Sequence, residues 1–215
     1  MSDPRALLAD LGAQVAAGRL IPYLGAEVLT IGGAEPPVPV GARELSHHLC
    51  AKVAVPGRIR NNLWHTAQYI ESFRHRVTLD RLMADFFKPV PAPTPLHRWL
   101  GTLDRLPLIV DTWYDGAMRK ALEHRADWGQ IQGASKARRL AEAPWVRAYD
   151  AAGGECPEAA AEGWNTLLYK PHGAAQPAGD VLASDADYVE VLTDIDIQTP
   201  IPQAVQERRM GRGFL

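Results

Sequence analysis

Long apolar runs are missing from this sequence of 215 residues. No stretch approaches the roughly 20 apolar residues that a membrane-spanning helix needs. The N-terminus also lacks the charged and then apolar segments that mark a secretory signal. We therefore expect a cytoplasmic protein with no membrane partner.

An excess of positive charge is also missing, because 23 Lys and Arg stand against 25 Asp and Glu. Such a chain offers no basic field to a phosphate backbone, so we expect no nucleic-acid partner. Cysteine is scarce, and Cys50 and Cys156 do not have the spacing of a zinc module or a disulfide framework. His47, His48 and Cys50 share a predicted helix but point in different directions, so we expect no metal site.

The opening of the chain predicts a helix that leads into a buried strand. Asp3 suits a helix cap, Pro4 suits the first helical position and Gly18 ends the helix. We expect the apolar face of this helix to pack on the sheet; the face is formed by Leu7, Leu8, Leu11 and Val15. The apolar residues 20–24 then predict the first strand of an α/β fold, with a ligand loop at its carboxyl end.

Residues 41–100 predict a helical insertion after the first strand. Apolar residues recur at helical spacing over residues 42–53, 63–70 and 79–87, and Thr78 is the expected cap of the third helix. Residues 88–95 contain four prolines and predict an extended crossing. Within this crossing, Thr94 followed by proline predicts the start of another short helix.

The rest of the chain predicts further strands and helices. The expected strands are residues 108–110, 129–132, 145–149, 166–170 and 211–215, and the expected helices are residues 117–124, 184–193 and 202–210. We therefore expect one domain over residues 1–215, an α/β fold with a Rossmann-like parallel sheet flanked by helices. A parallel strand would normally continue past Leu215, so we expect the C-terminus to be incomplete.

Three polar clusters follow predicted strands, at residues 25–27, 112–115 and 172–173. The carboxyl ends of parallel strands meet at one edge of a sheet, so we expect these clusters to lie together. In sequence letters, the chain has GAEVL at residues 25–29, DTWYD at 111–115, KPHG at 170–173 and SDADY at 184–188.

These four motifs resemble those of the sirtuin-like (SIR2-like) NAD-binding domains of bacteria. That family shows, in the same order, Gly-Ala-Gly-x-Ser, Thr-x-Asn-Tyr-Asp, Lys-x-His-Gly and Thr-x-x-Asp-Tyr. The resemblance covers most of residues 20–190. It implies an NAD site whose residues correspond to Gly25, Ala26, Thr112, Trp113 and Tyr114, and catalytic positions at His172 and Asp115. In the family the glycine loop holds the pyrophosphate, the Asn binds ribose and the His is a general base.

The chain departs from the family at the positions that carry chemistry. Trp113 replaces the Asn, and an indole has one N–H donor and no acceptor. Glu27 replaces the second glycine and adds negative charge where a diphosphate would lie, and Leu29 replaces the Ser. The absence of two cysteine pairs also argues against a zinc-bearing deacylase.

Several of these residues also have ordinary structural interpretations. Gly25 suits a tight turn without any ligand, and Asp115 suits a cap of the helix that follows it. Trp113 either fills the vacated ribose space as core or offers a new stacking surface. We expect Tyr188 to pack its ring in the core.

We therefore expect a catalytically inactive sirtuin-like domain that acts as a protein-binding accessory or regulatory factor. The candidate anchors of a protein interface are the helical insertion, the proline-rich crossing and several tryptophans. These tryptophans are Trp64, Trp99, Trp128, Trp145 and Trp164. The resemblance implies a nitrogenase component as one candidate partner, because sirtuin-like chains of this size occur among accessory factors of nitrogen-fixing bacteria. No cofactor is firmly expected, and NAD and ADP-ribose are the candidates. The alternatives are an NAD hydrolase or ADP-ribosyl-transferring enzyme, and a nucleotide sensor without turnover.

Overall fold

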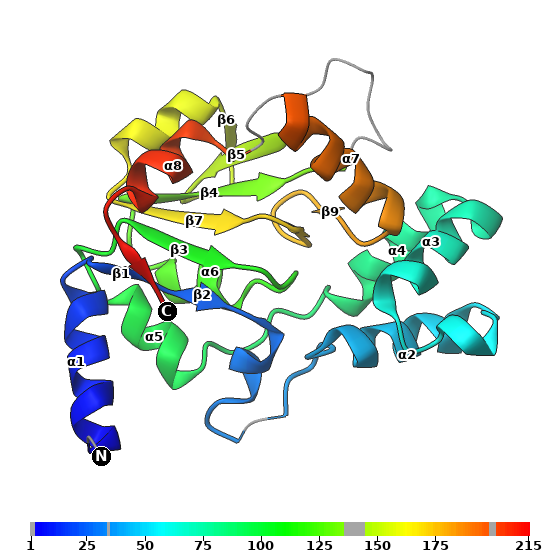
Figure 1. The fold of residues 1–215 in the computed structure, drawn as a ribbon, viewed down its shortest axis with the longest axis horizontal. Coiled ribbons are helices and arrows are strands. Elements are labelled where there is room, and N and C mark those ends of the chain that lie inside the picture. Colours follow the sequence, from blue (N-terminus) through cyan, green and yellow to red (C-terminus); the bar gives the residue numbers. More distant parts are fainter. Residues whose placement is uncertain (1–2, 34, 136–144, 198–200) are drawn as a thin grey trace.

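The structure, a computed structural model, describes residues 3–33, 35–135, 145–197 and 201–215 (Figure 1). A six-stranded sheet with the order β2-β3-β7-β4-β5-β6 forms its centre. Its strands are β2 (Tyr23–Leu24), β3 (Leu108–Asp111), β7 (Thr166–Lys170), β4 (Trp128–Gly133), β5 (Val146–Asp150) and β6 (Glu155–Cys156). The predicted Rossmann-like α/β class is confirmed.

The sheet is mixed rather than wholly parallel. Strands β2, β3, β7 and β4 pair in parallel, whereas β5 pairs antiparallel with both β4 and β6. Only residues 151–154 separate β5 from β6, and a parallel pairing needs a crossover of a dozen or more residues. The antiparallel strands lie at the opposite edge of the sheet from β2, β3 and β7, which are the strands that the three polar clusters follow.

The predicted first strand is split in two. β1 (Leu20–Ile21) pairs in parallel with β10 (Gly213–Phe214), and β2 pairs with β3. Pro22 lies between them and has no N–H to donate, although its carbonyl accepts a bond from the Val110 N–H at 3.0 Å. The strand predicted at residues 211–215 is therefore present, as the partner of β1.

The first helix, α1 (Pro4–Ala16), begins as predicted, and the Asp3 side chain accepts a hydrogen bond from the Arg5 N–H. The expectation that its apolar face packs on the sheet is wrong. Leu7 and Leu8 are 53% and 68% exposed, and Val15 is the residue of this helix that is buried. The helix points away from the sheet, and its last turn, with Val15, reaches the core (Figure 1).

The helical insertion forms the right-hand part of Figure 1. Its elements are α2 (Ala42–Lys52), η2 (Gly57–Ile59), α3 (Leu63–Arg74) and α4 (Arg76–Phe86), and the 3₁₀ helix η1 (Ala26–Thr30) precedes it. The prediction that Thr78 caps the third helix is wrong, because α4 begins two residues earlier and Thr78 donates to the Arg74 carbonyl. His75, with a φ of 70°, separates α3 from α4.

The two faces of the sheet are covered by short helices. Leu100 of α5 (Pro95–Gly101) and Met118 of α6 (Ala117–Leu122) pack with Ile109 on one face. Val205 of α8 (Gln203–Arg209) and Ala161 of η4 (Glu158–Gly163) pack on the other. A two-stranded sheet of β8 (Gly173–Ala174) and β9 (Asp180–Val181) leads into α7 (Asp185–Ile197). None of the helices in the described ranges has the length and apolar character to cross a bilayer.

Candidate functional site

A cavity of about 510 Å³ lies at the carboxyl ends of β2, β3 and β7, against helix α3 of the insertion. It is lined by Gly25, Ala26, Glu27, Val28, Gly41, Ala42, Leu63, Trp64, Thr112, Trp113, Tyr114, His172 and Tyr188. All five predicted cofactor-binding residues are among them, together with His172. The predicted convergence of the three polar clusters is therefore what the structure shows.

The loop after β2 carries the first of these clusters. Gly25 has a φ of −112°, and a Cβ added to it would meet no atom within 4 Å, so neither the backbone nor the space requires glycine there. Glu27 lies in the first turn of η1, is exposed to solvent and also lines the cavity. The loop thus brings a carboxylate to the cavity.

Trp113 forms part of the cavity wall and is also part of the core. Its side chain is 7% exposed, and its Nε1–H donates to the Pro39 carbonyl oxygen at 2.8 Å. The ring packs edge-on against Phe87 and lies 5.0 Å from the ring of Tyr114. Because the indole has no second donor, it cannot donate a hydrogen bond to a ligand while this bond is kept.

Asp115 does not line the cavity. It is buried, and its Oδ1 accepts a hydrogen bond at 2.8 Å from the N–H of Ala117, the first residue of α6. Lys170 Nζ donates to the Asp115 carbonyl and to Asp111 Oδ2, at 2.8 Å and 2.7 Å. Burial raises the pKa of Asp111 to about 6, although Lys170 opposes this shift. The expected cap role of Asp115 is therefore met only in part, because Gly116 is the cap residue of α6 and the Asp115 carboxylate accepts from the first N–H of the helix.

His172 presents a neutral imidazole to the cavity. Its Nδ1 lies 3.0 Å from the Thr112 carbonyl oxygen, which can only accept, so Nδ1 carries the proton and Nε2 is free to accept. Burial lowers the pKa of His172, which favours the neutral ring. The adjacent Gly173 has a φ of 78°, and a Cβ there would lie 2.1 Å from the Asp180 carbonyl oxygen. This close approach to β9 explains why a glycine follows the histidine.

Two aromatic residues that line the cavity were not among the predicted site residues. Tyr188 of α7 and Trp64 of α3 line the cavity, with ring centroids 5.9 Å apart and ring planes at 90°. The expectation that Tyr188 is a core residue is therefore wrong, since its ring packs edge-on against His172 at the cavity. The SDADY motif was the signal that could have placed Tyr188 there, but no sequence signal connects Trp64 with this edge.

A model of the SIR2-like domain family matches residues 107–215. The chain belongs to this family. The matched segment contains residues 112–115, His172 and Tyr188, whereas the loop after β2 and the helical insertion lie before it. No curated protein matches the chain.

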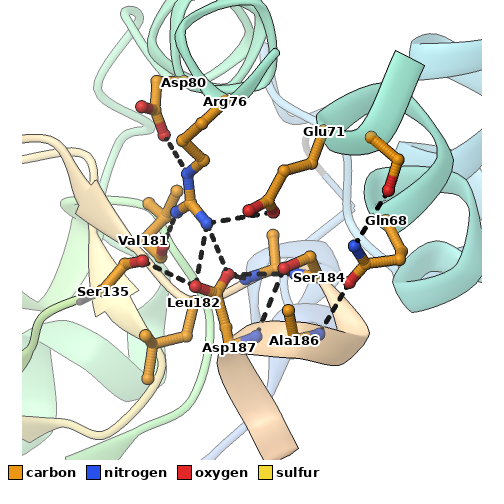
Figure 2. A network of polar contacts seen from close by, with 12 residues as sticks. Gln68, Glu71, Arg76, Asp80, Ser135, Val181, Leu182, Ser184, Ala186 and Asp187 are labelled. Atoms are coloured by element: carbon orange, nitrogen blue, oxygen red, sulfur yellow. Dashed lines mark hydrogen bonds and ion pairs between the residues drawn. The ribbon is translucent and has the colours of Figure 1, made fainter. Parts of the chain in front are cut away.

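In this SIR2-like domain, a buried ionic network fixes the insertion to the start of α7 (Figure 2). The Arg76 guanidinium of α4 donates to both carboxylate oxygens of Asp187, at 2.8 and 2.9 Å, and to Asp80 Oδ1 at 2.8 Å. It also donates to the Val181 carbonyl oxygen of β9 at 2.6 Å, and Ser135 Oγ donates to Asp187 Oδ1. Burial alone would lower the pKa of Arg76, but the carboxylates of Asp187 and Asp80 raise it.

The same aspartate completes the cap of α7. Ser184 Oγ accepts from the Asp187 N–H, and Asp187 Oδ2 accepts from the Ser184 N–H, so the predicted cap at Ser184 is confirmed. Trp64 and Arg76 belong to the α3–α4 hairpin, and Asp187 and Tyr188 belong to α7, so the network joins the two elements that carry these rings. This contact links segments 111 positions apart in the chain.

Among the described residues that line the cavity, Glu27 is the one whose side chain is formally charged, since His172 is neutral. The other polar lining side chains are Thr112, two indoles and two phenols. Thr112 Oγ1 and the Tyr114 hydroxyl already donate to the carbonyls of Leu24 and Leu182. The cavity therefore combines aromatic walls with negative charge.

Proposed function

We propose that this SIR2-like domain is catalytically inactive and acts as a protein-binding accessory or regulatory factor in the cytoplasm. The observation that carries the proposal is the hydrogen bond from Trp113 to Pro39, which uses the only polar atom of the side chain at the ribose position. Losing one positioned polar group typically costs on the order of a hundredfold in rate. Without a group that orients the ribose, the neutral His172 has no positioned substrate on which to act as a general base.

Glu27 supports the proposal from the other side of the cavity. It lies at the position where the family resemblance places the diphosphate, and like charges repel there. No lysine or arginine lines this part of the described cavity to offset the repulsion. The negative charge of Glu27 would therefore oppose the binding of an intact dinucleotide.

Exposed apolar side chains on the insertion and beyond support a protein partner. The large exposed apolar side chains in this part of the molecule are Trp64, Phe73, Val77, Val90 and Trp99. Tryptophan and phenylalanine are enriched among the residues that anchor protein interfaces. Trp128, by contrast, is fully buried, so it is a core residue and not an anchor.

The test of inactivity is to incubate the purified protein with NAD and to follow nicotinamide release. We expect no release above the rate of the buffer. Turnover that disappears in His172→Ala would overturn the proposal and would favour the NAD-hydrolase or ADP-ribosyl-transferring alternative. The free Nε2 of His172 is the observation that keeps this alternative in the test.

Calorimetric titration with NAD and with ADP-ribose separates an inactive scaffold from a nucleotide sensor. We expect no saturable binding to the wild-type protein. The Glu27→Gly variant restores the family glycine, so a gain of affinity in this variant would show that the charge alone blocks the site. Tight binding of either nucleotide to the wild-type protein would instead support the sensor.

A pull-down from the native host tests the partner. We expect a stable protein complex, and a nitrogenase component is the candidate that the family setting suggests. The Phe73→Ser and Val77→Ser variants change exposed side chains, so they should weaken the complex without unfolding the domain. A complex that both variants retain at full strength would place the interface elsewhere.

A further inference from the structure

The cavity walls carry four aromatic rings, those of Trp64, Trp113, Tyr114 and Tyr188. They form two adjacent pairs. Trp64 and Tyr188 have centroids 5.9 Å apart with perpendicular planes, and Trp113 and Tyr114 have centroids 5.0 Å apart at 46°. A group held beside either pair therefore lies close to two rings.

A cation is attracted to the face of an aromatic ring when it lies within about 6 Å of the centroid. The cavity adds the carboxylate of Glu27, for which the described residues show no ion-pair partner, and its histidine is neutral. Aromatic rings and a carboxylate both favour a cation and both disfavour a diphosphate.

We propose that the cavity binds an organic ammonium group, carried either by a small free molecule or by a lysine side chain of a partner protein. This inference rests on the proposed function, because NAD would need the same space. At about 510 Å³ the cavity is larger than an ammonium group alone, so it also holds part of the chain that carries the group.

The probe is choline, and its matched control is 3,3-dimethylbutan-1-ol, in which a neutral carbon replaces the quaternary nitrogen. Tryptophan fluorescence or calorimetry follows the titration of each compound. We expect choline to bind about tenfold more tightly than the neutral alcohol, because only choline gains from the rings and from Glu27. Equal affinity for the two compounds would overturn the inference.

Two variants locate the site. Trp64→Leu removes a ring that is 42% exposed, and we expect it to weaken choline binding about tenfold. Trp99→Leu is the matched control, because Trp99 is 37% exposed on α5 and does not line the cavity. Glu27→Gln should weaken choline binding about threefold and should remove part of its salt dependence. Equal losses in the two tryptophan variants would contradict the site.

A peptide that contains trimethyllysine distinguishes the two sources of the ammonium group. Binding at least tenfold tighter than choline assigns the group to a partner protein, and equal binding assigns it to a free molecule. Failure of the inference and failure of the proposed function give different results. Choline without effect in an NAD-inactive protein removes the ammonium site alone, whereas NAD turnover lost in His172→Ala removes the proposed function.

Discussion

Arg76 and Glu27 are both charged residues near the boundary between the helical insertion and the sheet, but their surroundings differ. The Arg76 side chain is 10% exposed and makes ionic contacts with Asp187, Asp80 and Glu71. Glu27 is exposed and borders a cavity whose other described lining residues carry no formal charge. The charge of Arg76 joins the helical insertion to α7, whereas the charge of Glu27 is available to a ligand.

This difference shows that the fold and the ligand chemistry of the domain are held by separate residues. The Arg76 network and the cap of α7 join the α3–α4 hairpin, which carries Trp64, to the helix that carries Tyr188. These contacts do not involve Glu27, Leu29 or Trp113, at which the chain departs from the family. A domain can therefore keep its architecture while its ligand edge changes, and each half of this statement can be tested.

The largest effect is expected from Arg76→Met. Removing the guanidinium takes from the buried Asp187 the cation that Arg76 supplies, and breaking a buried ion pair from one side costs about 3–5 kcal/mol. Urea unfolding should show this loss. Arg74→Met is the control, because Arg74 is exposed at the end of α3 and should change stability by less than about 0.5 kcal/mol. Similar losses in both variants would mean that the network does not join the two parts.

The pH dependence of stability tests another framework residue, His97 of α5. Burial lowers the pKa of His97 to about 4, and its Nδ1 accepts a hydrogen bond from the Thr94 N–H. The unfolded chain binds a proton at this histidine more readily, so the contribution of His97 to the free energy of unfolding should fall by about 3 kcal/mol as pH drops from about 6.5 to about 4. Asp111 opposes this fall, because its raised pKa makes the folded chain bind a proton more readily in the same range. The difference between the wild type and His97→Gln, measured by urea unfolding at several pH values, isolates the histidine.

His172 is the comparison on the cavity side. Burial lowers its pKa also, so protonation of the unfolded chain should again reduce stability as pH falls below about 6.5. His172→Gln should remove a smaller part of the loss of stability in acid than His97→Gln does. If His172→Gln removed the larger part, the buried His97 would not be the main acid-sensitive histidine.

Ser184→Ala should have a smaller effect, of about 1 kcal/mol, because it removes one cap hydrogen bond of α7 and leaves the Arg76 pair in place. Ser72→Ala is the control. Its hydroxyl is exposed on α3 and accepts a bond from Gln68, so thermal unfolding should change little. A loss as large as that in Arg76→Met would mean that the cap and the network act as one unit.

The sequence predicts elements whose signals are local. Asp3-Pro4, Thr94-Pro95 and Ser184 are each a cap followed by helical residues, and each begins a helix. The exposed face of α1 and the antiparallel β5 could not be predicted in this way. Periodicity marks an apolar face but does not say what covers it, and a short strand does not carry its own direction.

The candidate site shows the same limit. Six of the seven predicted site residues meet at one cavity because strand ends in a parallel sheet converge, and three of the four motifs contain them. Asp115 does not line the cavity, and its carboxylate accepts a hydrogen bond from the Ala117 N–H at the start of α6. Trp64 was missed as a cavity residue because it meets Tyr188, which is far away in the sequence, and such a contact leaves no local pattern. The role of the six residues in binding a cofactor stays a prediction.

The smallest effect on stability is expected from Glu27→Gln. Glu27 is exposed, and the described residues give its carboxylate no ion-pair partner, so exchanging it for an amide of the same shape removes no folded-state contact. The free energy of unfolding should change by less than about 0.5 kcal/mol in urea. Choline affinity should fall in the same variant, since the charge serves the cavity and not the fold. A large loss of stability would show that Glu27 is a framework residue like Arg76, and the separation between fold and ligand edge would then fail at the residue on which it depends most.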